Sequence, residues 1–439
     1  MKPPTVSVRT LAAAGLLTFV LGAYGQSQEK ENLLTLDLQM MTRGEIRDGG
    51  LADEKEEIFS DKSNFVIERE RLIVGYEKSW LQMKLNIQHQ GIWGQSGKGS
   101  TNVYEGWAKL EAKNGLFAKV GRQTLSYDDE RIIGPNDWSM AGLSHDALKL
   151  GYEGHGHKAH VILAYNQNAE NVNGGTYYVK GAYPYKTMQT AWYHYDLPHV
   201  PLGASALFMN IGMQGGEKNV NERTEWQQVL GGYLKYNPKH WSVEGSYYRQ
   251  MGKNEDGVKI DAWMASVKAQ VSPSNIYGFE AGYDYLSGDK YFAVPPKGGL
   301  GLVKHDVIKG FNPIYGSHHK FYGAMDFFYV STYVNGFSPG LQNAFVGGYV
   351  KPIQGLHVGL SYHYLAMSTK LPDMDKKLGH EFELTASYQI IKDVKVSAGF
   401  SYMTGTKTME RLKRASDDGN LTWGWLSLNI TPRIFTTKW

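Results

Sequence analysis

A dense group of charged residues between positions 122 and 131 is the part of the chain best suited to polar chemistry. It contains Arg122, Asp128, Asp129, Glu130 and Arg131. Opposed charges so close together could sort charged solutes at a constriction, or they could pair with one another at the base of a loop. The ligand spacing of an EF-hand calcium loop is absent. The sequence leaves the first two interpretations open.

Histidines form the second candidate group. His155, His157 and His160 could offer imidazole nitrogens to a metal, and so could the adjacent pair His318 and His319. No cysteine or carboxylate accompanies either group at the spacing of known metal sites. We therefore expect no metal site and no cofactor.

Catalytic motifs are missing from the chain. There is no cysteine nucleophile, no Gly-x-Ser-x-Gly elbow and no His-Glu-x-x-His helix, since His380-Glu381 is followed by Phe382-Glu383-Leu384. A Ser, a His and an Asp could still converge in space. We expect a protein that is not an enzyme, with an outer-membrane hydrolase as the least favoured alternative.

The first 25 residues resemble a secretory signal peptide. Lys2 and Arg9 precede an apolar stretch from Leu11 to Leu21, and Ala23-Tyr24-Gly25 offers a small-x-small cleavage site. Removing those two cations from the 46 Lys and Arg leaves 44 against 43 Asp and Glu. A nearly neutral mature chain has no basic excess to attract nucleic acid. Residues 26–439 are expected to form one domain.

The elements that would position polar side chains are strands. In residues 81–90, Leu81, Met83, Leu85 and Ile87 alternate with amide and charged residues, as in a strand with one apolar face. The same pattern predicts strands at 33–43, 64–76, 79–91, 102–112, 116–126, 146–153, 158–167, 186–196, 202–213, 223–236, 240–251, 258–271, 274–286, 341–351, 355–366, 378–390, 394–404 and 420–431. Short and long connections alternate between them, as in outer-membrane barrels. We predict an all-β, 18-stranded antiparallel transmembrane barrel in the outer membrane of a Gram-negative bacterium.

Two features qualify this pattern. Pro432 interrupts the last strand and must lie at a strand end or on a bulge. Segment 287–340 is far longer than ordinary loops, which suggests a functional role. It is rich in aromatic residues, including Phe327-Phe328-Tyr329, so we expect it to fold into or over the pore. The alternative is an extra hairpin at 320–335, which would give 20 strands.

Alternation also predicts which side chains line the pore. Arg122 shares parity with apolar Ala118 and Val120 and is expected at the outer rim, while Glu68 and Glu70 leave the parity of their strand ambiguous. The candidate pore-lining residues are Arg69, Arg71, Lys84, Gln88, Glu105, Lys109, Lys119, Arg131, Lys149, Glu280, Glu381 and Glu383. Their charges are of both signs.

Two stretches carry a resemblance to a known family. The first combines Gly121-Arg122-Gln123, Asp137-Trp138 and Asp146-Ala147-Leu148-Lys149-Leu150, and the second runs from Phe311-Asn312-Pro313 to His318-His319-Lys320-Phe321, followed by Gly323 and Asp326. Both stretches resemble the alginate-export family of outer-membrane channels. The resemblance implies a monomeric 18-stranded barrel and a polysaccharide exporter whose electropositive lumen guides a polyuronate. A lining of mixed charge differs from such a lumen.

The sequence therefore predicts an outer-membrane channel for hydrophilic solutes, with saccharides, oligosaccharides or polysaccharides as the expected class. Its expected partners are outer-membrane lipid and lipopolysaccharide, the polar solute and, for export, periplasmic components. The main alternative is a non-conducting barrel that serves as a surface anchor or adhesin.

Overall fold

The computed structural model describes residues 31–48, 62–95, 97–167, 185–217, 220–290, 306–328, 338–413 and 420–439. The expected signal peptide at 1–25 lies outside these residues. Within the described ranges, no helix has the length and apolar character needed to cross a bilayer.

Strands account for most of the fold. The barrel strands are β1 (Leu33–Asp48), β2 (Ser63–Lys78), β3 (Leu81–Ile92), β4 (Ser100–Glu111), β5 (Leu116–Gln123), β6 (His145–Gly154), β7 (His157–Tyr165), β8 (Thr187–Asp196), β9 (Leu202–Gly215), β10 (Arg223–Tyr236), β11 (Trp241–Lys253), β12 (Lys259–Val271), β13 (Tyr277–Leu286), β15 (Leu341–Val350), β16 (Leu356–Ala366), β17 (Lys377–Ile391), β18 (Val394–Gly405), β19 (Asn420–Ile430) and β20 (Arg433–Lys438). Three short elements are not members of the ring: β14 (Val307–Ile308), which pairs parallel to the start of β12, the 3-10 helix η1 (His318–Lys320) and helix α2 (Lys407–Lys413).

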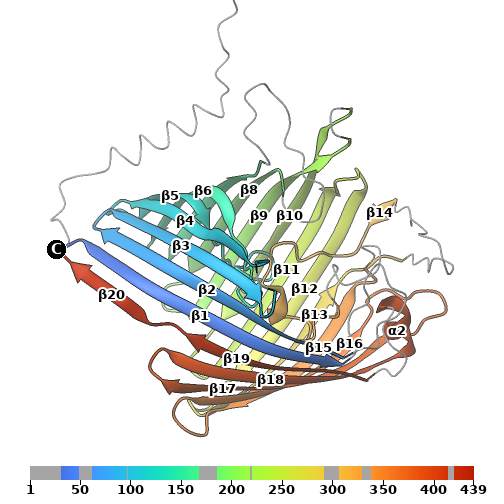
Figure 1. Cartoon of the computed structure of the whole chain (residues 1–439). Coiled ribbons are helices and arrows are strands. Elements are labelled where there is room, and N and C mark those ends of the chain that lie inside the picture. The colour runs from blue at the N-terminus through green and yellow to red at the C-terminus, as the bar shows by residue number, and fades with distance from the viewer. Residues whose placement is uncertain are drawn as a thin grey trace, which may run out of the picture.

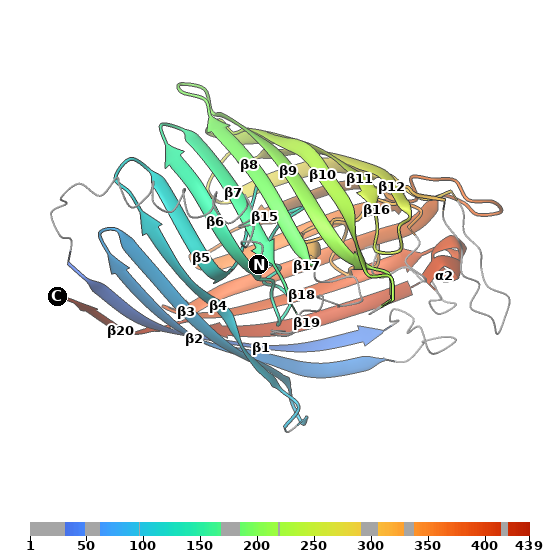
Figure 2. The ribbon, with the colours of Figure 1, turned by 90° about the horizontal axis from the view of Figure 1, so that it is seen from above.

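The strands close into a ring. Each pairs antiparallel with the next, and β1 pairs with β2 on one side and with both β19 and β20 on the other (Figures 1 and 2). Only Thr431 and Pro432 separate β19 from β20, so these two are successive pieces of one barrel strand. The predicted 18-stranded antiparallel barrel is confirmed. Described residues 320–328 add no strand to the ring, and the rest of the alternative hairpin lies outside the described residues.

Pro432 lies at the break between β19 and β20, as its missing amide hydrogen requires. The pairing of β1 with β20 shifts register there, between Leu36 and Asp37. The two described ends of the chain meet at the other end of β20, where the Asn32 amide donates to the Trp439 carbonyl at 2.8 Å. They lie at the end of the barrel that carries the short turns (Figure 1).

The outer face of the ring is an apolar belt. Large hydrophobic side chains such as Val120, Leu360, Phe400 and Leu426 remain at least half exposed. Exposed apolar area on this scale is unfavourable in water and is matched to the hydrocarbon of a bilayer. Arg122 also lies on this face, in a two-armed ion pair with Asp146 (2.9 and 2.8 Å).

A charge placed in the belt should destabilise the folded barrel. Leu384 lies at the midpoint of β17 and is 48% exposed, so Leu384→Arg is expected to cost about 2–4 kcal/mol in the free energy of folding into phosphatidylcholine vesicles. The adjacent Thr385 points to the other face, and Thr385→Arg should cost under about 1 kcal/mol. Equal losses in urea titrations of the two variants would contradict this orientation of β17.

Candidate functional site

Two segments far apart in sequence join each other beside the inner face of the barrel. One is 124–144, which connects β5 to β6, and the other is 306–328. A parallel bridge pairs Ile133 with Tyr315, and the Gly134 amide donates to the Tyr315 carbonyl at 2.8 Å. The Ser317 amide donates to the Glu130 carbonyl at 2.9 Å. These contacts make one structural unit of the two segments.

Arg131 is the ionic centre of this unit. Its guanidinium contacts Asp129 of its own segment at 3.1 Å and Asp284 of β13 at 3.2 Å. It also donates to the Tyr322 hydroxyl at 2.9 Å and lies 4.0 Å from the centre of the Phe321 ring. Burial opposes the charge, but Asp284, Tyr322 and Asp129 hold the pKa of Arg131 above its usual value. Arg131 therefore ties both segments to the barrel wall.

The two neighbouring acids have separate partners. Asp128 accepts from Trp192 Nε1 of β8 at 3.0 Å and from the Tyr248 hydroxyl of β11 at 3.1 Å, while burial raises its pKa. Burial also acts on Glu130, but hydrogen bonds from Lys320, Ser126 and Ser317 keep its pKa below the usual range. The charged group found in the sequence thus behaves as the ion-paired base of a loop.

The wall formed by β2 and β3 holds the other side of segment 124–144. Arg69 Nη1 donates to the carbonyls of Asp137 (3.1 Å) and Ser139 (3.2 Å), and Arg71 contacts the Asp137 carboxylate at 2.8 Å. Gln88 accepts from Arg71 at 2.8 Å. These contacts place Arg69 and Arg71 on the inner face and resolve the parity that the sequence left ambiguous.

The side chain of Glu381 of β17 binds the backbone of segment 306–328. Its carboxylate accepts from the Met325 amide at 2.9 Å, and its side chain has no exposed surface. Gly323 has φ +91°, and a Cβ there would lie 2.3 Å from Glu381 Oε2. Only glycine allows the carboxylate and this turn to approach so closely.

The predicted lining residues fall into two groups. The first group is buried and consists of Arg69, Arg71, Gln88, Glu105, Arg131 and Glu381. Except for Glu105, the polar atoms of these residues bind the two segments or each other. Lys84, Lys109, Lys119, Lys149, Glu280 and Glu383 are half-buried. The second group contains the side chains left for contact with a solute.

Half-buried lysines gather on β3 to β6. Lys109, Lys119 and Lys149 lie directly opposite one another across β4, β5 and β6. Lys84 pairs with Glu105, and Lys109 pairs with Glu111 at 2.8 Å. Within the described chain, Lys119 and Lys149 have no carboxylate within 4.0 Å. Lys119 Nζ lies instead 3.8 Å from the centre of the Trp107 ring. Like charges directly opposite destabilise a sheet, so this row does not serve stability.

Half-buried carboxylates gather on β13 to β17. The register aligns Glu280 of β13, Gly347 of β15, Ser361 of β16 and Glu383 of β17 in one lateral row. Glu280 accepts from Gln270 at 2.8 Å and Glu383 from Ser361 at 3.1 Å. In the part of the chain that is described, neither has a Lys or Arg partner within 4.0 Å.

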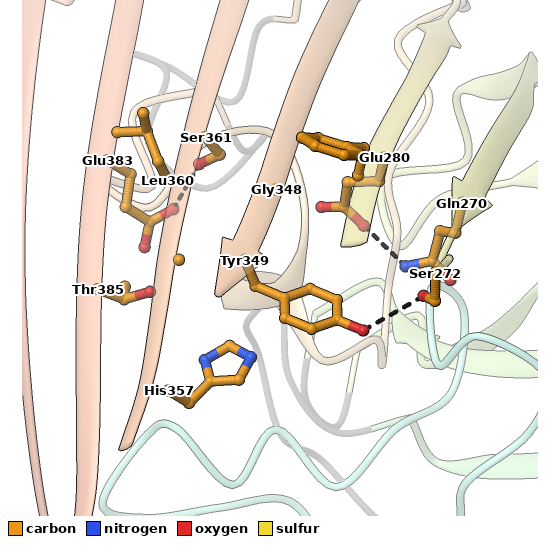
Figure 3. A pocket seen from close by; sticks show the side chains of 12 residues that line it. Gln270, Ser272, Glu280, Gly348, Tyr349, His357, Leu360, Ser361, Glu383 and Thr385 are labelled. Carbon is orange, nitrogen blue, oxygen red and sulfur yellow. Dashed lines mark hydrogen bonds between the residues drawn. The ribbon is translucent and has the colours of Figure 1, made fainter. Parts of the chain in front are cut away.

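These two acids line a polar pocket of about 460 Å³. Tyr349 and His357 form its aromatic side, with ring centres 5.2 Å apart, and the Tyr349 hydroxyl donates to Ser272 at 3.2 Å (Figure 3). The pocket also contains Thr385 and Gln270. Carboxylate, hydroxyl, amide and aromatic groups thus converge on one space.

The strands that carry the unpaired lysines, β5 and β6, form a basic wall, and β13 to β17 form an acidic wall. These walls face each other across the barrel. In one direction they are separated by the six strands β7 to β12. In the other direction they are separated by β18, by β19 with β20, and by β1 to β4. Lys119 follows the first residue of β5 by three positions, and Glu280 follows the first residue of β13 by three. Both strands begin at short turns, so Lys119 and Glu280 lie at the same number of residues from the short-turn ends of their strands. The lining is mixed in composition but sorted by wall.

Sequence reasoning missed several members of this arrangement. Alternation places Asp284 on the inner face but could not predict its pairing with Arg131, which lies far away in the chain. Tyr322 and the Tyr349–His357 pair were not singled out, because their contacts depend on the tertiary structure. The ion pair between Lys109 and Glu111 could have been predicted, because these two residues lie two apart on the same face of one strand. No group of three or more metal-ligating side chains converges in the described parts of the chain.

Comparison with known proteins identifies the fold. No protein-family model and no curated protein matches the chain. Among solved structures, Pseudomonas aeruginosa OccK11 (OpdR) matches at a TM-score of 0.60 with 14% identity, covering 94% of this chain and 100% of that one. Pseudomonas aeruginosa OccK2 (OpdF) matches at 0.60 with 11% identity over 92% and 98%, and Acinetobacter baumannii OccAB1 at 0.59 with 11% over 92% and 97%. The chain therefore shares the fold of the OprD/Occ outer-membrane porins.

Removing the Arg131 guanidinium should loosen the two joined segments. Arg131→Met leaves Asp129 and Asp284 buried without their cation, which is expected to cost about 3–5 kcal/mol in the free energy of unfolding. The triple variant R131M/D129N/D284N should recover part of this loss, since it buries no unpaired charge. Lys320→Met removes a mostly exposed cation and should cost under about 1 kcal/mol. Urea titrations in which R131M and K320M lose equal stability would refute the central role of Arg131.

Proposed function

We propose that the protein is an outer-membrane channel that passes hydrophilic solutes. A closed ring with an apolar outer belt and charged inner walls has the architecture of a membrane pore. The fold shared with the OprD/Occ porins supports the same function and a location in the outer membrane of a Gram-negative bacterium. The observation that carries the proposal is the pair of opposed charged walls, because unpaired charges on an inner face are costly unless water or solute reaches them.

Residues 306–328, a described part of the loop at 287–340, form the constriction of this channel together with segment 124–144. Arg69 and Glu381 of the barrel wall bind the backbone of the two segments, and Arg131 of segment 124–144 binds Asp284 of the wall. These contacts fix the position of both segments relative to the inner face. Solutes then pass beside a surface held by buried ion pairs. This constriction brings a solute near the walls that carry the unpaired lysines and glutamates.

Saccharides, from small sugars to polysaccharides, are the solute class of this proposal. The pocket at Glu280 and Glu383 has groups that can contact sugars. Carboxylates accept hydrogen bonds from sugar hydroxyls, amides accept or donate them, and an aromatic ring packs on the C–H face of a sugar ring. A relationship to the alginate-export barrels is part of the proposal. The two stretches that resemble that family contact each other through Ile133 and Tyr315. Export of a polymer would add periplasmic components as partners.

Conductance tests the channel directly. The full-length protein reconstituted in planar bilayers should carry current, and proteoliposomes should swell in neutral mono- and disaccharides. Replacing 306–328 by a short Gly-Ser linker should raise the conductance, because it removes part of the constriction. Absence of current from both proteins would contradict the channel and favour a surface anchor or adhesin. Turnover of lipid or peptide, abolished by one Ser or His change, would favour a hydrolase.

The unpaired lysines should set part of the ion selectivity. Lys119→Gln with Lys149→Gln is expected to lower the permeability of chloride relative to potassium by about twofold, since water on the lumen side screens these half-buried charges. Lys253 and Lys259 lie opposite each other and are exposed on the outer-face parity of β11 and β12. K253Q/K259Q removes the same charge there and should leave the reversal potential unchanged. An equal shift in both double variants would show that net charge, and not the inner wall, sets selectivity.

A further inference from the structure

The carboxylates of the acidic pocket differ from that of Glu244, which also lies on the inner face. Glu244 of β11 contacts Lys268 at 2.6 Å and Lys235 at 3.3 Å, and it also accepts from the Tyr233 hydroxyl at 2.6 Å. Glu280 and Glu383 each accept one neutral hydrogen bond, both through Oε2. Within the described residues their Oε1 atoms have no bonding partner. A half-buried carboxylate in this condition is ready to bind a cation that comes from solution.

The groups around these carboxylates suit a hydroxylated ring. The Tyr349 ring is held by its hydrogen bond to Ser272 and by stacking on His357, so it presents a fixed aromatic surface. Lys351 Nζ lies 5.1 Å from the centre of the same ring, which shows that the ring accepts a positive charge. Ser361 and Thr385 add hydroxyl groups to the same space (Figure 3).

Glycines keep this space open. A Cβ at Gly359 would lie 2.8 Å from Thr385 Oγ1, and a Cβ at Gly347 would lie 3.2 Å from the Leu360 carbonyl and 3.4 Å from Glu280. Gly347 lies in the row that joins Glu280 to Glu383, and Gly359 lies in the next inner-face row, between Tyr349 and Thr385. The 460 Å³ that results falls in the range of small-molecule sites.

The opposite wall decides the sign of the preferred ligand. Lys119 and Lys149 repel a cation from their side of the lumen, while Glu280 and Glu383 attract it from theirs, so a cationic group is drawn to the pocket. An anionic group is drawn the other way.

We propose that the pocket lined by Glu280, Glu383, Tyr349 and His357 is a binding subsite for a hydroxylated solute that carries a protonated primary amine, which is the chemistry of an amino sugar. The ammonium binds the free carboxylate oxygens, and the ring packs on Tyr349 with its hydroxyls toward Ser361 and Thr385. This proposal rests on the proposed channel function only in the sense that solute must reach the inner face.

Equilibrium binding tests the subsite without requiring transport. Calorimetric titration of the detergent-solubilised full-length protein should show D-glucosamine binding about tenfold more tightly than N-acetyl-D-glucosamine, whose amine is neutral. The preference should weaken as salt rises, because half-exposed charges are screened. E280Q/E383Q should bind the two sugars about equally. Glu111→Gln removes a carboxylate that is already paired with Lys109 and should keep the preference.

Equal binding of the two sugars by the natural protein would overturn the subsite, and so would a preference that survives in E280Q/E383Q. Proteoliposome swelling separates this failure from that of the channel. Swelling in glucose without any amine preference in the titrations would refute the subsite and leave the channel standing. An amine preference in the titrations without swelling would refute the channel and leave the subsite standing.

Discussion

Every strand of this protein depends on the closure of the ring by β1. Hydrocarbon offers no partner to a backbone amide or carbonyl, so each strand that faces lipid must be paired on both sides. β1 achieves this by pairing with β2 along one edge and with β19 and β20 along the other. Closure in turn fixes which side chains face lipid, because a slip of one residue would turn every side chain to the opposite face. The apolar belt and the charged interior are two consequences of the same pairing.

The interior is organised more like a protein core than like a water-filled tube. Arg131, a buried cation, and Glu381, a buried carboxyl group, hold two chain segments against the wall. Such groups are costly to bury and become tolerable only when all their partners are present. Five of the twelve charged and amide residues expected in the lining serve this structural purpose: Arg69, Arg71, Gln88, Arg131 and Glu381. The six half-buried residues lie on the lumen side, where they can act on a solute.

The remaining charges are separated in space. Among the described residues, lysines without carboxylate partners lie on β5 and β6, and glutamates without Lys or Arg partners lie on β13 and β17. Six strands separate the two walls in each direction. A lining that is neutral in sum can therefore still orient a solute, because a dipolar or amine-bearing molecule meets opposite signs on its two sides. This charge distribution differs from the uniformly electropositive lumen that would guide a polyanion.

The sequence by itself determined the strands and their faces. The alternation of Leu81, Met83, Leu85 and Ile87 with polar residues, the position of Arg122 on the outer face and the break at Pro432 all follow from local rules of strand geometry. Only the tertiary structure decided which polar residues share a partner. Arg131 meets Asp284 and Tyr322 across more than a hundred residues, and Glu280 joins Glu383 through the register of four strands. Alternation tells which face a side chain takes, but closure of the ring and inter-strand register bring distant residues together, and neither is written in any local stretch of the chain.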